Sequence, residues 1–433
     1  MECTLRCDSI NAGRGPIGPI VPKIRISEGE MAKHTWIGLA ALVAGGLAAG
    51  GVGAAERARD LGVPFEGTPG ALNAITDLAG VEVGQVTKVS GEGLLVVGKG
   101  PVRTGVTMVL PRGRGSAAPV YGGFFNLNGN GEMTGQSYFE DFGLVFGPIG
   151  ISNTNAIGQV YAGIQEWSSK TFGSAIWPVV AETWDGGLND LEGFHIQSAD
   201  AIEAIGAAKP GPVQEGNVGG GTGMVCFDFK GGIGTASRVV EIDGKPVTVG
   251  VLVQCNTGER STLRIAGMPV GRDLADRWLS CYQPDLSPAN KTPKCTADGT
   301  GGIRKPDQGS IIIVVGTDAP LIPTQLNRVA RRAALGLGRL GSYAGNGSGD
   351  LVVTFSTTAD PVDIDGETPV PLVQFPNGSI DPIFEATVQA TEEAVVNAMV
   401  AAETMTGANG HRFYALPHDE LKQLLVKYNR LAP

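Results

Sequence analysis

The sequence predicts a layered domain of the α/β or α+β class, and three observations support this interpretation. Several runs of consecutive apolar residues have the length of strands that are covered on both faces. Longer segments with apolar residues at helical spacing lie between these runs and can supply the cover. Glycine accounts for 66 of 433 residues, about twice the ordinary share, which indicates many tight turns and close backbone contacts.

The individual elements follow from these patterns. The expected strands cover residues 105–110, 224–229, 247–254, 310–315 and 351–355. The expected helices cover residues 155–167, 198–208, 321–339, 383–404 and 419–428. Thr317, Asp318 and Pro320 are typical of a helix start, so we expect the helix over 321–339 to begin near them. Residues 273–309 have the composition of a linker between a long first part and a shorter last part.

Charge and composition exclude several classes of function. Hydrophobic residues make up 42% of the chain and charged residues 18%, which excludes intrinsic disorder. The net charge is −10 and Lys and Arg do not cluster, which argues against nucleic acid as a partner. Residues 93–100 fit the pattern G-x-x-x-x-G-K but lack the Ser or Thr that would bind magnesium. A G-x-S-x-G motif is absent, so an α/β-hydrolase is not expected.

The N-terminal region carries the features of an export signal. Lys33 and His34 precede an apolar stretch over residues 37–50, and small residues follow it before Glu56. We therefore expect residues 31–55 to be a signal peptide and residues 1–30 to be an unstructured, over-long start. The apolar stretch is shorter than the roughly 20 residues that a membrane anchor needs. The mature protein is then expected to be periplasmic or secreted.

The cysteines beyond this region are expected in two different states. Cys281 and Cys295 bracket a loop of 13 residues, and in an oxidising compartment this spacing suits a disulfide. Such a link stabilises a fold by about 3 kcal/mol when it is treated as a loss of chain entropy. Neither His nor a third Cys lies near this pair, so a zinc site is not expected. Cys226 and Cys255 lie in strand-like runs and are expected to be buried thiols.

The junction between Gly309 and Ser310 joins a flexible segment to a fully apolar strand. Cleavage before Ser310 would give this residue a free α-amine beside its hydroxyl. An α-amine has a pKa of about 8, so at neutral pH it can act as the base for that hydroxyl. Ser310 would then hold nucleophile and base together without a histidine. His195 offers the alternative of a Ser-His-Asp triad, although a loop or core histidine is the simpler interpretation.

The motifs GSIIIVVGTDAP (309–320) and NGSGDLVVTFST (346–357) resemble those of the DmpA-type aminopeptidases, the L-aminopeptidase/D-amidase-esterases and β-peptidyl aminopeptidases. Further matching blocks lie at 67–84, 102–111, 147–155, 179–190, 216–238 and 249–258. The resemblance implies a four-layer αββα sandwich that forms a single large domain. It also implies a precursor that cuts itself between Gly309 and Ser310 into an α subunit, 56–309, and a β subunit, 310–433. The αβ units are expected to assemble further, into a tetramer of heterodimers.

The resemblance also assigns chemical roles to single residues. Ser310 matches the nucleophile of the family. Ser348 matches the Ser of the family's S-G-[DE] motif and would hold the amine and hydroxyl of Ser310 in register, with Asp350 favouring the protonated amine. Asn256 matches the Asn whose side-chain amide donates to the developing oxyanion. Cys255, beside it, differs from the small residue expected in relatives.

Two further residues are expected to bind substrate. Glu182 lies at the end of an apolar strand and matches the carboxylate that anchors the substrate ammonium. A carboxylate there explains exopeptidase action, because only a free N-terminus supplies the matching cation. Trp184 stands where several relatives carry Tyr, and an indole offers only an N–H in place of the hydroxyl. The loop over 273–309 is longer than in relatives, which can alter substrate access.

These assignments predict a self-processing serine aminopeptidase that releases N-terminal residues from small peptides, amides or esters with a free amine. Neither a metal nor an organic cofactor is implied. One alternative is an acyltransferase of the ornithine acetyltransferase type, although those enzymes use Thr at the cut site. A second alternative is a binding protein with the same fold that is never processed. The choice among L-α, D-α and β residues stays open, with Gly309-Ser310 and Asp350 leaning towards the L-aminopeptidase/D-amidase type.

Overall fold

The structure, a computed structural model, describes residues 56–296, 299, 300, 302, 309–358 and 372–432. The expected over-long start (1–30) and signal peptide (31–55) lie outside these residues. The described residues belong to one structural unit. None of their helices combines the length and the apolar character needed to cross a membrane.

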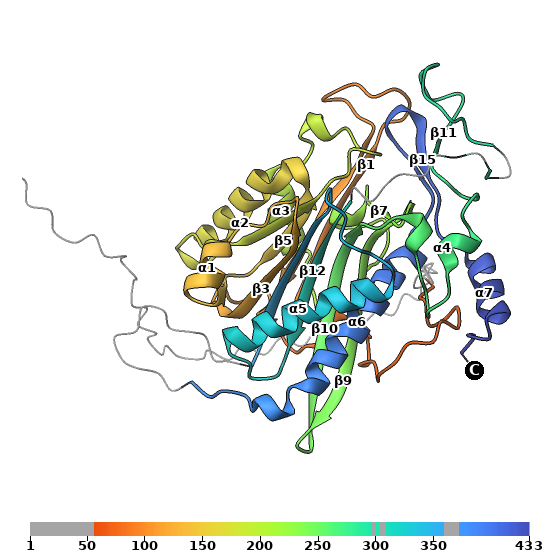
Figure 1. Cartoon of the computed structure of the whole chain (residues 1–433). Helices are drawn as coiled ribbons and strands as arrows, with labels where there is room; N and C mark the ends of the chain where they lie inside the picture. Colours follow the sequence, from red (N-terminus) through yellow and green to blue (C-terminus); the bar gives the residue numbers. More distant parts are fainter. Residues whose placement is uncertain (1–55, 297–298, 301, 303–308, 359–371, 433) are drawn as a thin grey trace, which may run out of the picture. The chain divides into compact units, whose positions relative to one another are not determined.

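Two large sheets form the centre of the described unit (Figure 1). The six-stranded sheet has the order β4 (Leu144–Val145), β3 (Val120–Gly129), β13 (Gly349–Ser356), β12 (Ser310–Thr317), β10 (Lys245–Asn256) and β9 (Gly232–Ile242). The four-stranded sheet has the order β1 (Glu82–Ser90), β2 (Val102–Leu110), β5 (Ile149–Asn153) and β6 (Val179–Thr183). The two sheets pack face to face, and apolar side chains from both fill the space between them.

Helices cover the outer face of each sheet (Figure 1). The smaller sheet packs against α2 (Ile157–Phe172) and α3 (Ser198–Gly206), and the larger sheet packs against α5 (Pro323–Arg339) and α6 (Asp381–Val400). In β12, Ile311 and Ile313 face the helices, whereas Ile312 and Val314 face the other sheet. Because both faces of β12 are covered, its sequence is a continuous apolar run. The expected four-layer αββα sandwich is therefore confirmed.

The remaining elements are short and lie around this sandwich. They are α1 (Gln136–Asp141), α4 (Val270–Asp273), α7 (His418–Lys427), β7 (Val225–Cys226), β8 (Phe229–Lys230), β11 (Cys281–Tyr282), β14 (Met405–Thr406) and β15 (His411–Phe413). The expected single strand over 224–229 is wrong, because Phe227 and Asp228 adopt φ values of 50° and 59° and turn the chain between β7 and β8. This turn places Asp228 at the functional site described below.

Two other expectations need correction. The helix expected over 321–339 is present as Pro323–Arg339, but Thr317, Asp318 and Pro320 do not form its start. Thr317 is the last residue of β12, and Asp318 accepts a hydrogen bond of 2.7 Å from the Thr248 N–H. The stretch over 273–309 is not simply a linker. Within its described part, β11 pairs with β15 in a small sheet, so this segment packs against the C-terminal region of the chain.

Candidate active site

Three strand ends meet at one edge of the larger sheet. Antiparallel pairing of β10 with β12 places Asn256 opposite Ser310, and parallel pairing of β12 with β13 places Ser310 opposite Gly349. The Gly349 N–H donates a hydrogen bond of 3.1 Å to Ser310 Oγ. Asn256 and Ser310 are 5% and 6% exposed, so both side chains are buried, and Asn256 and Gly309 line a pocket described below. Strand register therefore brings together residues that are distant in sequence.

The backbone before Ser310 is closely packed as well. A β-carbon at Gly309 would lie only 1.8 Å from the backbone oxygen of Asn256. No other residue type fits there without displacing one of these two backbone segments. Gly309 is thus held directly against the strand that carries Asn256.

A hydroxyl and a carboxylate lie on the neighbouring strand. Ser348 Oγ donates a hydrogen bond of 2.7 Å to Asp350 Oδ1, and it lies 3.3 Å from the hydroxyl of Thr257. All three side chains are buried. The residue between Ser348 and Asp350 is Gly349, which contacts Ser310. The three predicted residues Ser310, Ser348 and Asp350 are therefore brought together at the adjacent starts of β12 and β13.

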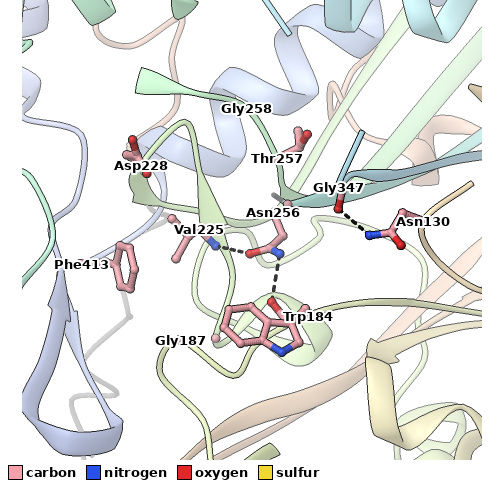
Figure 2. A pocket seen from close by; sticks show the side chains of 12 residues that line it. Asn130, Trp184, Gly187, Val225, Asp228, Asn256, Thr257, Gly258, Gly347 and Phe413 are labelled. Atoms are coloured by element: carbon pink, nitrogen blue, oxygen red, sulfur yellow. Dashed lines mark hydrogen bonds between the residues drawn. The ribbon is translucent and has the colours of Figure 1, made fainter. Parts of the chain in front are cut away.

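The side-chain amide of Asn256 is held at both ends (Figure 2). Its Oδ1 accepts a hydrogen bond of 2.8 Å from the Val225 N–H, and its Nδ2 donates one of 2.9 Å to the Trp184 carbonyl. An amide nitrogen carries two hydrogens. Among the described residues, the bond to Trp184 uses one of them, which leaves the second for an acceptor in the pocket.

Glu182 is a buried carboxylate close to this junction. Its Oε1 accepts a hydrogen bond of 3.1 Å from the Glu132 N–H, and its Oε2 accepts one from the Thr154 hydroxyl. Burial raises the pKa of Glu182, and the hydrogen bond from Thr154 opposes this shift. A β-carbon at Gly131 would lie 3.1 Å from Glu182 Oε1 and 3.2 Å from Gly349 Cα. One glycine therefore separates the carboxylate from the backbone that contacts Ser310.

Trp184 contributes a wall of the pocket rather than a buried donor. Its side chain is 47% exposed and lies against Gly186, where a β-carbon would be 2.6 Å from the indole ring. Its backbone carbonyl holds Asn256, as described above. The side chain is thus free to contact a ligand, while the main chain positions the amide.

A pocket of about 580 Å³ opens beside these residues (Figure 2). Its lining consists of Asn130, Trp184, Gly187, Gly223, Val225, Asp228, Asn256, Thr257, Gly258, Gly309, Gly347 and Phe413. The glycines among these residues have no side chain and therefore leave room for a ligand. Such a volume suits a small peptide or amide. Sequence reasoning did not identify Asn130, Asp228 or Phe413, although Asp228 lies in the matching block at 216–238.

Two disulfides lie within the described residues. Cys281 and Cys295 are joined, as their spacing suggested. Cys226 and Cys255 are joined as well, so the expectation of two buried thiols is wrong. The hairpin of β7 and β8 folds back against the end of β10 and brings their Cα atoms to 5.5 Å, a contact between residues 29 apart that no local pattern reveals. In the part of the chain that the structure describes, no cluster of His, Cys, Asp or Glu could hold a metal ion.

Comparison with known proteins identifies a family and several relatives. The model of peptidase family S58 matches residues 73–413. The β-peptidyl aminopeptidase BapA of Sphingosinicella microcystinivorans is 53% identical over 395 residues, which are 90% of this chain and 98% of the relative. The enzyme of the same name from Sphingosinicella xenopeptidilytica is 47% identical over 379 residues, 86% of this chain and 91% of the relative.

A solved structure shares the whole architecture. The L-aminopeptidase D-Ala-esterase/amidase of Ochrobactrum anthropi, described as a new variant among the Ntn hydrolase fold, superposes with a TM-score of 0.76 at 42% identity. The match covers 87% of this chain and 99% of that chain. A Burkholderia β-aminopeptidase superposes with a TM-score of 0.73 at 38% identity, over 86% of this chain and 99% of that chain.

Proposed function

Because the chain belongs to peptidase family S58 and is an aminopeptidase, we propose that Ser310 is its nucleophile and becomes N-terminal by cleavage after Gly309. The single observation that carries this proposal is the junction of three strands. It sets Ser310 beside Asn256 and the Ser348–Asp350 pair. The sequence left two alternatives open, an acyltransferase and an unprocessed binding protein. Neither of them fits this family.

Maturation proceeds by an acyl shift. In the precursor, Ser310 Oγ attacks the Gly309 carbonyl carbon, and the carbon–nitrogen bond breaks to leave an ester. Water then hydrolyses the ester, which releases the Gly309 carboxylate and a Ser310 with a free amine and hydroxyl. The pairing of Asn256 with Ser310 and the packing of Gly309 on its backbone support a role of the Asn256 amide as donor to the tetrahedral oxyanion.

Turnover uses the same groups on a peptide substrate. The Ser310 amine takes the hydroxyl proton as Oγ attacks the scissile carbonyl. Asn256 Nδ2 donates its second hydrogen to the oxyanion. The protonated amine gives its proton to the leaving amine, and an acyl-enzyme ester remains. Water hydrolyses this ester with the amine again acting as base, so the cycle needs no other reactant.

Ser348 orients the Ser310 amine, and Asp350 stabilises its positive charge. The Ser348 hydroxyl is fixed by its bond to Asp350, so its oxygen can accept from the ammonium formed during turnover. The Asp350 carboxylate stabilises the positive charge of that ammonium. Burial of both side chains strengthens this interaction, because little solvent screens it.

Glu182 binds the ammonium of the substrate, and this restricts the enzyme to free N-termini. A buried carboxylate stays ionised when a cation approaches it, even though burial alone raises its pKa. We assign β-amino acid residues as the preferred N-terminal group, because two relatives with about half of their residues identical are named β-peptidyl aminopeptidases. This differs from the slight preference for the L-aminopeptidase/D-amidase type that the residues suggested.

Export and further assembly belong to the same proposal. Two disulfides among the described residues support an oxidising compartment, either periplasmic or extracellular. An assembly of αβ units into a tetramer of heterodimers is supported by exposed apolar side chains at Leu94, Leu95, Val96 and Val97. Light scattering of the purified enzyme measures this assembly, and the mass of a single αβ unit would contradict it.

The Ser310→Ala variant tests the proposal, with Ser342→Ala as a matched control in the same half of the chain. We expect Ser310→Ala to remain a single chain without activity on a β-homoamino acid p-nitroanilide. Ser342→Ala should be cut and active like the natural protein. A Ser310→Ala protein that is both cut and active would remove Ser310 from the mechanism.

A further inference from the structure

The Asn256 amide receives its orientation from two loops outside the larger sheet. Val225 belongs to β7, which among the described residues pairs with β8 alone. Trp184 follows β6 of the other sheet. The amide therefore depends on the position of segments that the ladder of β10 does not itself hold (Figure 2).

A disulfide joins one of these segments to the strand that carries Asn256. Cys226 follows Val225 directly, and Cys255 precedes Asn256 directly. The disulfide between Cys226 and Cys255 thus joins the residue beside the hydrogen-bond donor to the residue beside the acceptor. A hydrogen bond of 2.7 Å from the Phe227 N–H to the Thr257 carbonyl also connects these segments.

The disulfide is enclosed by closely packed backbone. Both cysteines have no exposed surface. A β-carbon at Gly231 would lie 2.6 Å from Cys226 Cβ and 2.6 Å from the Cys255 oxygen. Cys255 itself lies near the end of β10 and is paired on both sides, with Ile311 of β12 and Gly232 of β9 as register partners. The disulfide therefore joins the hairpin of β7 and β8 to the larger sheet.

We propose that the Cys226–Cys255 disulfide is a positioning element for the oxyanion-binding amide of Asn256. The inference rests on the proposed role of Asn256 as oxyanion donor. Without the disulfide, Val225 can move away from Asn256 Oδ1, and the amide then rotates out of alignment. A hydrogen-bond donor acts on the oxyanion only when it is pre-aligned, so kcat falls while ground-state binding is retained.

The test removes this disulfide in Cys226→Ala/Cys255→Ala and compares it with Cys281→Ala/Cys295→Ala, which removes the other one. On a β-homoamino acid p-nitroanilide we expect the first variant to lose about tenfold or more in kcat, with KM within about twofold. The control should keep both constants. The rate of self-cleavage should fall in parallel with kcat, because it passes through the same kind of oxyanion. Unchanged kcat in the first variant would overturn the inference.

A cycle with Asn256→Ala separates positioning from general destabilisation. In the protein with both disulfides, Asn256→Ala should lower kcat by about 10²–10³-fold. In the Cys226→Ala/Cys255→Ala background, Asn256→Ala should lower kcat by a smaller factor. The two factors should differ by the loss in kcat that disulfide removal alone causes. Full additivity would contradict the inference. Wild-type kcat in Asn256→Ala alone would instead contradict the proposed role of Asn256.

Reversible reduction covers the case in which the double variant does not fold. The mature wild-type protein is treated with increasing reductant, alkylated and analysed by mass to locate the modified cysteines. We expect kcat to fall with the fraction modified at Cys226 and Cys255, and unalkylated reduced protein to recover kcat on reoxidation. Alkylation of both residues in fully active protein without reductant would overturn the inference.

Discussion

Ser348 Oγ donates a hydrogen bond of 2.7 Å to Asp350 Oδ1, and the residue between them, Gly349, donates its N–H to Ser310 Oγ. Residues two apart along a strand lie on the same side of it, so the hydroxyl and the carboxylate meet at the start of β13. One short segment therefore supplies a hydrogen bond to Ser310 and, next to it, a hydrogen-bonded hydroxyl and carboxylate.

Replacing the Asp350 carboxylate should impair turnover. Asp350→Asn keeps the shape of the side chain but removes the charge that favours the protonated Ser310 amine. We expect kcat to fall by about 10²-fold, the range of a general acid–base contribution. Asp350→Glu should retain most of the activity, and Asp419→Asn, an exposed site, should retain all of it. Steady-state kinetics of the mature proteins measure these effects. Wild-type kcat in Asp350→Asn would exclude the charge effect.

The pH dependence of KM in acid should report Glu182. Burial raises the pKa of this carboxyl above its ordinary value, so its ionised form is lost at a higher pH than for an exposed Glu. As the pH falls through that raised pKa, Glu182 takes up a proton and no longer binds the substrate ammonium. We expect KM to rise as the pH falls through this range. Glu182→Gln should raise KM at all pH values and remove this pH dependence of KM, which pH profiles of both proteins show.

Asp185 should make stability depend on pH. Burial raises the pKa of Asp185 to about 6, although Asn189 donates a hydrogen bond of 3.1 Å to its Oδ1. A raised folded pKa means that its contribution to stability is present in acid and is lost as the pH rises through about 6. Asp185→Asn should therefore increase the free energy of unfolding by about 3 kcal/mol above that pH, and by much less near pH 4. Urea unfolding at both pH values tests this. An equal difference at the two pH values would contradict it.

Lys230 should stabilise the segment over residues 221–231, which includes the pocket-lining Gly223, Val225 and Asp228. Its buried ammonium donates to the carbonyls of Met224 at 2.6 Å and Gly231 at 2.8 Å, and to that of Gly221 at 3.4 Å. Burial lowers its pKa well below the ordinary value. Lys230→Met leaves these buried carbonyls without their donor and should cost about 3 kcal/mol of stability. Lys245→Met, an exposed change, should cost almost nothing. Thermal unfolding of both variants measures the difference.

The sandwich itself could be predicted in outline from sequence because its central strands are apolar on both faces. The runs at 247–254, 310–315 and 351–355 lie in β10, β12 and β13. The sequence patterns did not predict β3 and β9, in which glycines contact helices. A β-carbon at Gly123 in β3 would lie 2.6 Å from Asn327 N of α5, and one at Gly234 in β9 would lie 2.0 Å from the Ala394 oxygen of α6. Glycine weakens the apolar pattern of a strand at the positions where a helix packs closest.

The site could be predicted only through the family resemblance. Asn256, Ser310 and Ser348 show no common spacing, and strand register alone makes them neighbours. The Cys226–Cys255 bond and the position of Asp228 in the pocket depend on the turn at Phe227, where φ is positive without a glycine. A left-handed residue of that type leaves no signature in the sequence. Trp184 was identified, but the part played by its backbone carbonyl could not be.

Mass analysis and N-terminal sequencing of the active, purified wild-type protein address the central mechanism without any mutation. Our account predicts two polypeptides, one of which begins at Ser310 and carries the acyl adduct when a slowly hydrolysed ester is added. Full activity in a preparation whose chain is unbroken between Gly309 and Ser310 would contradict it.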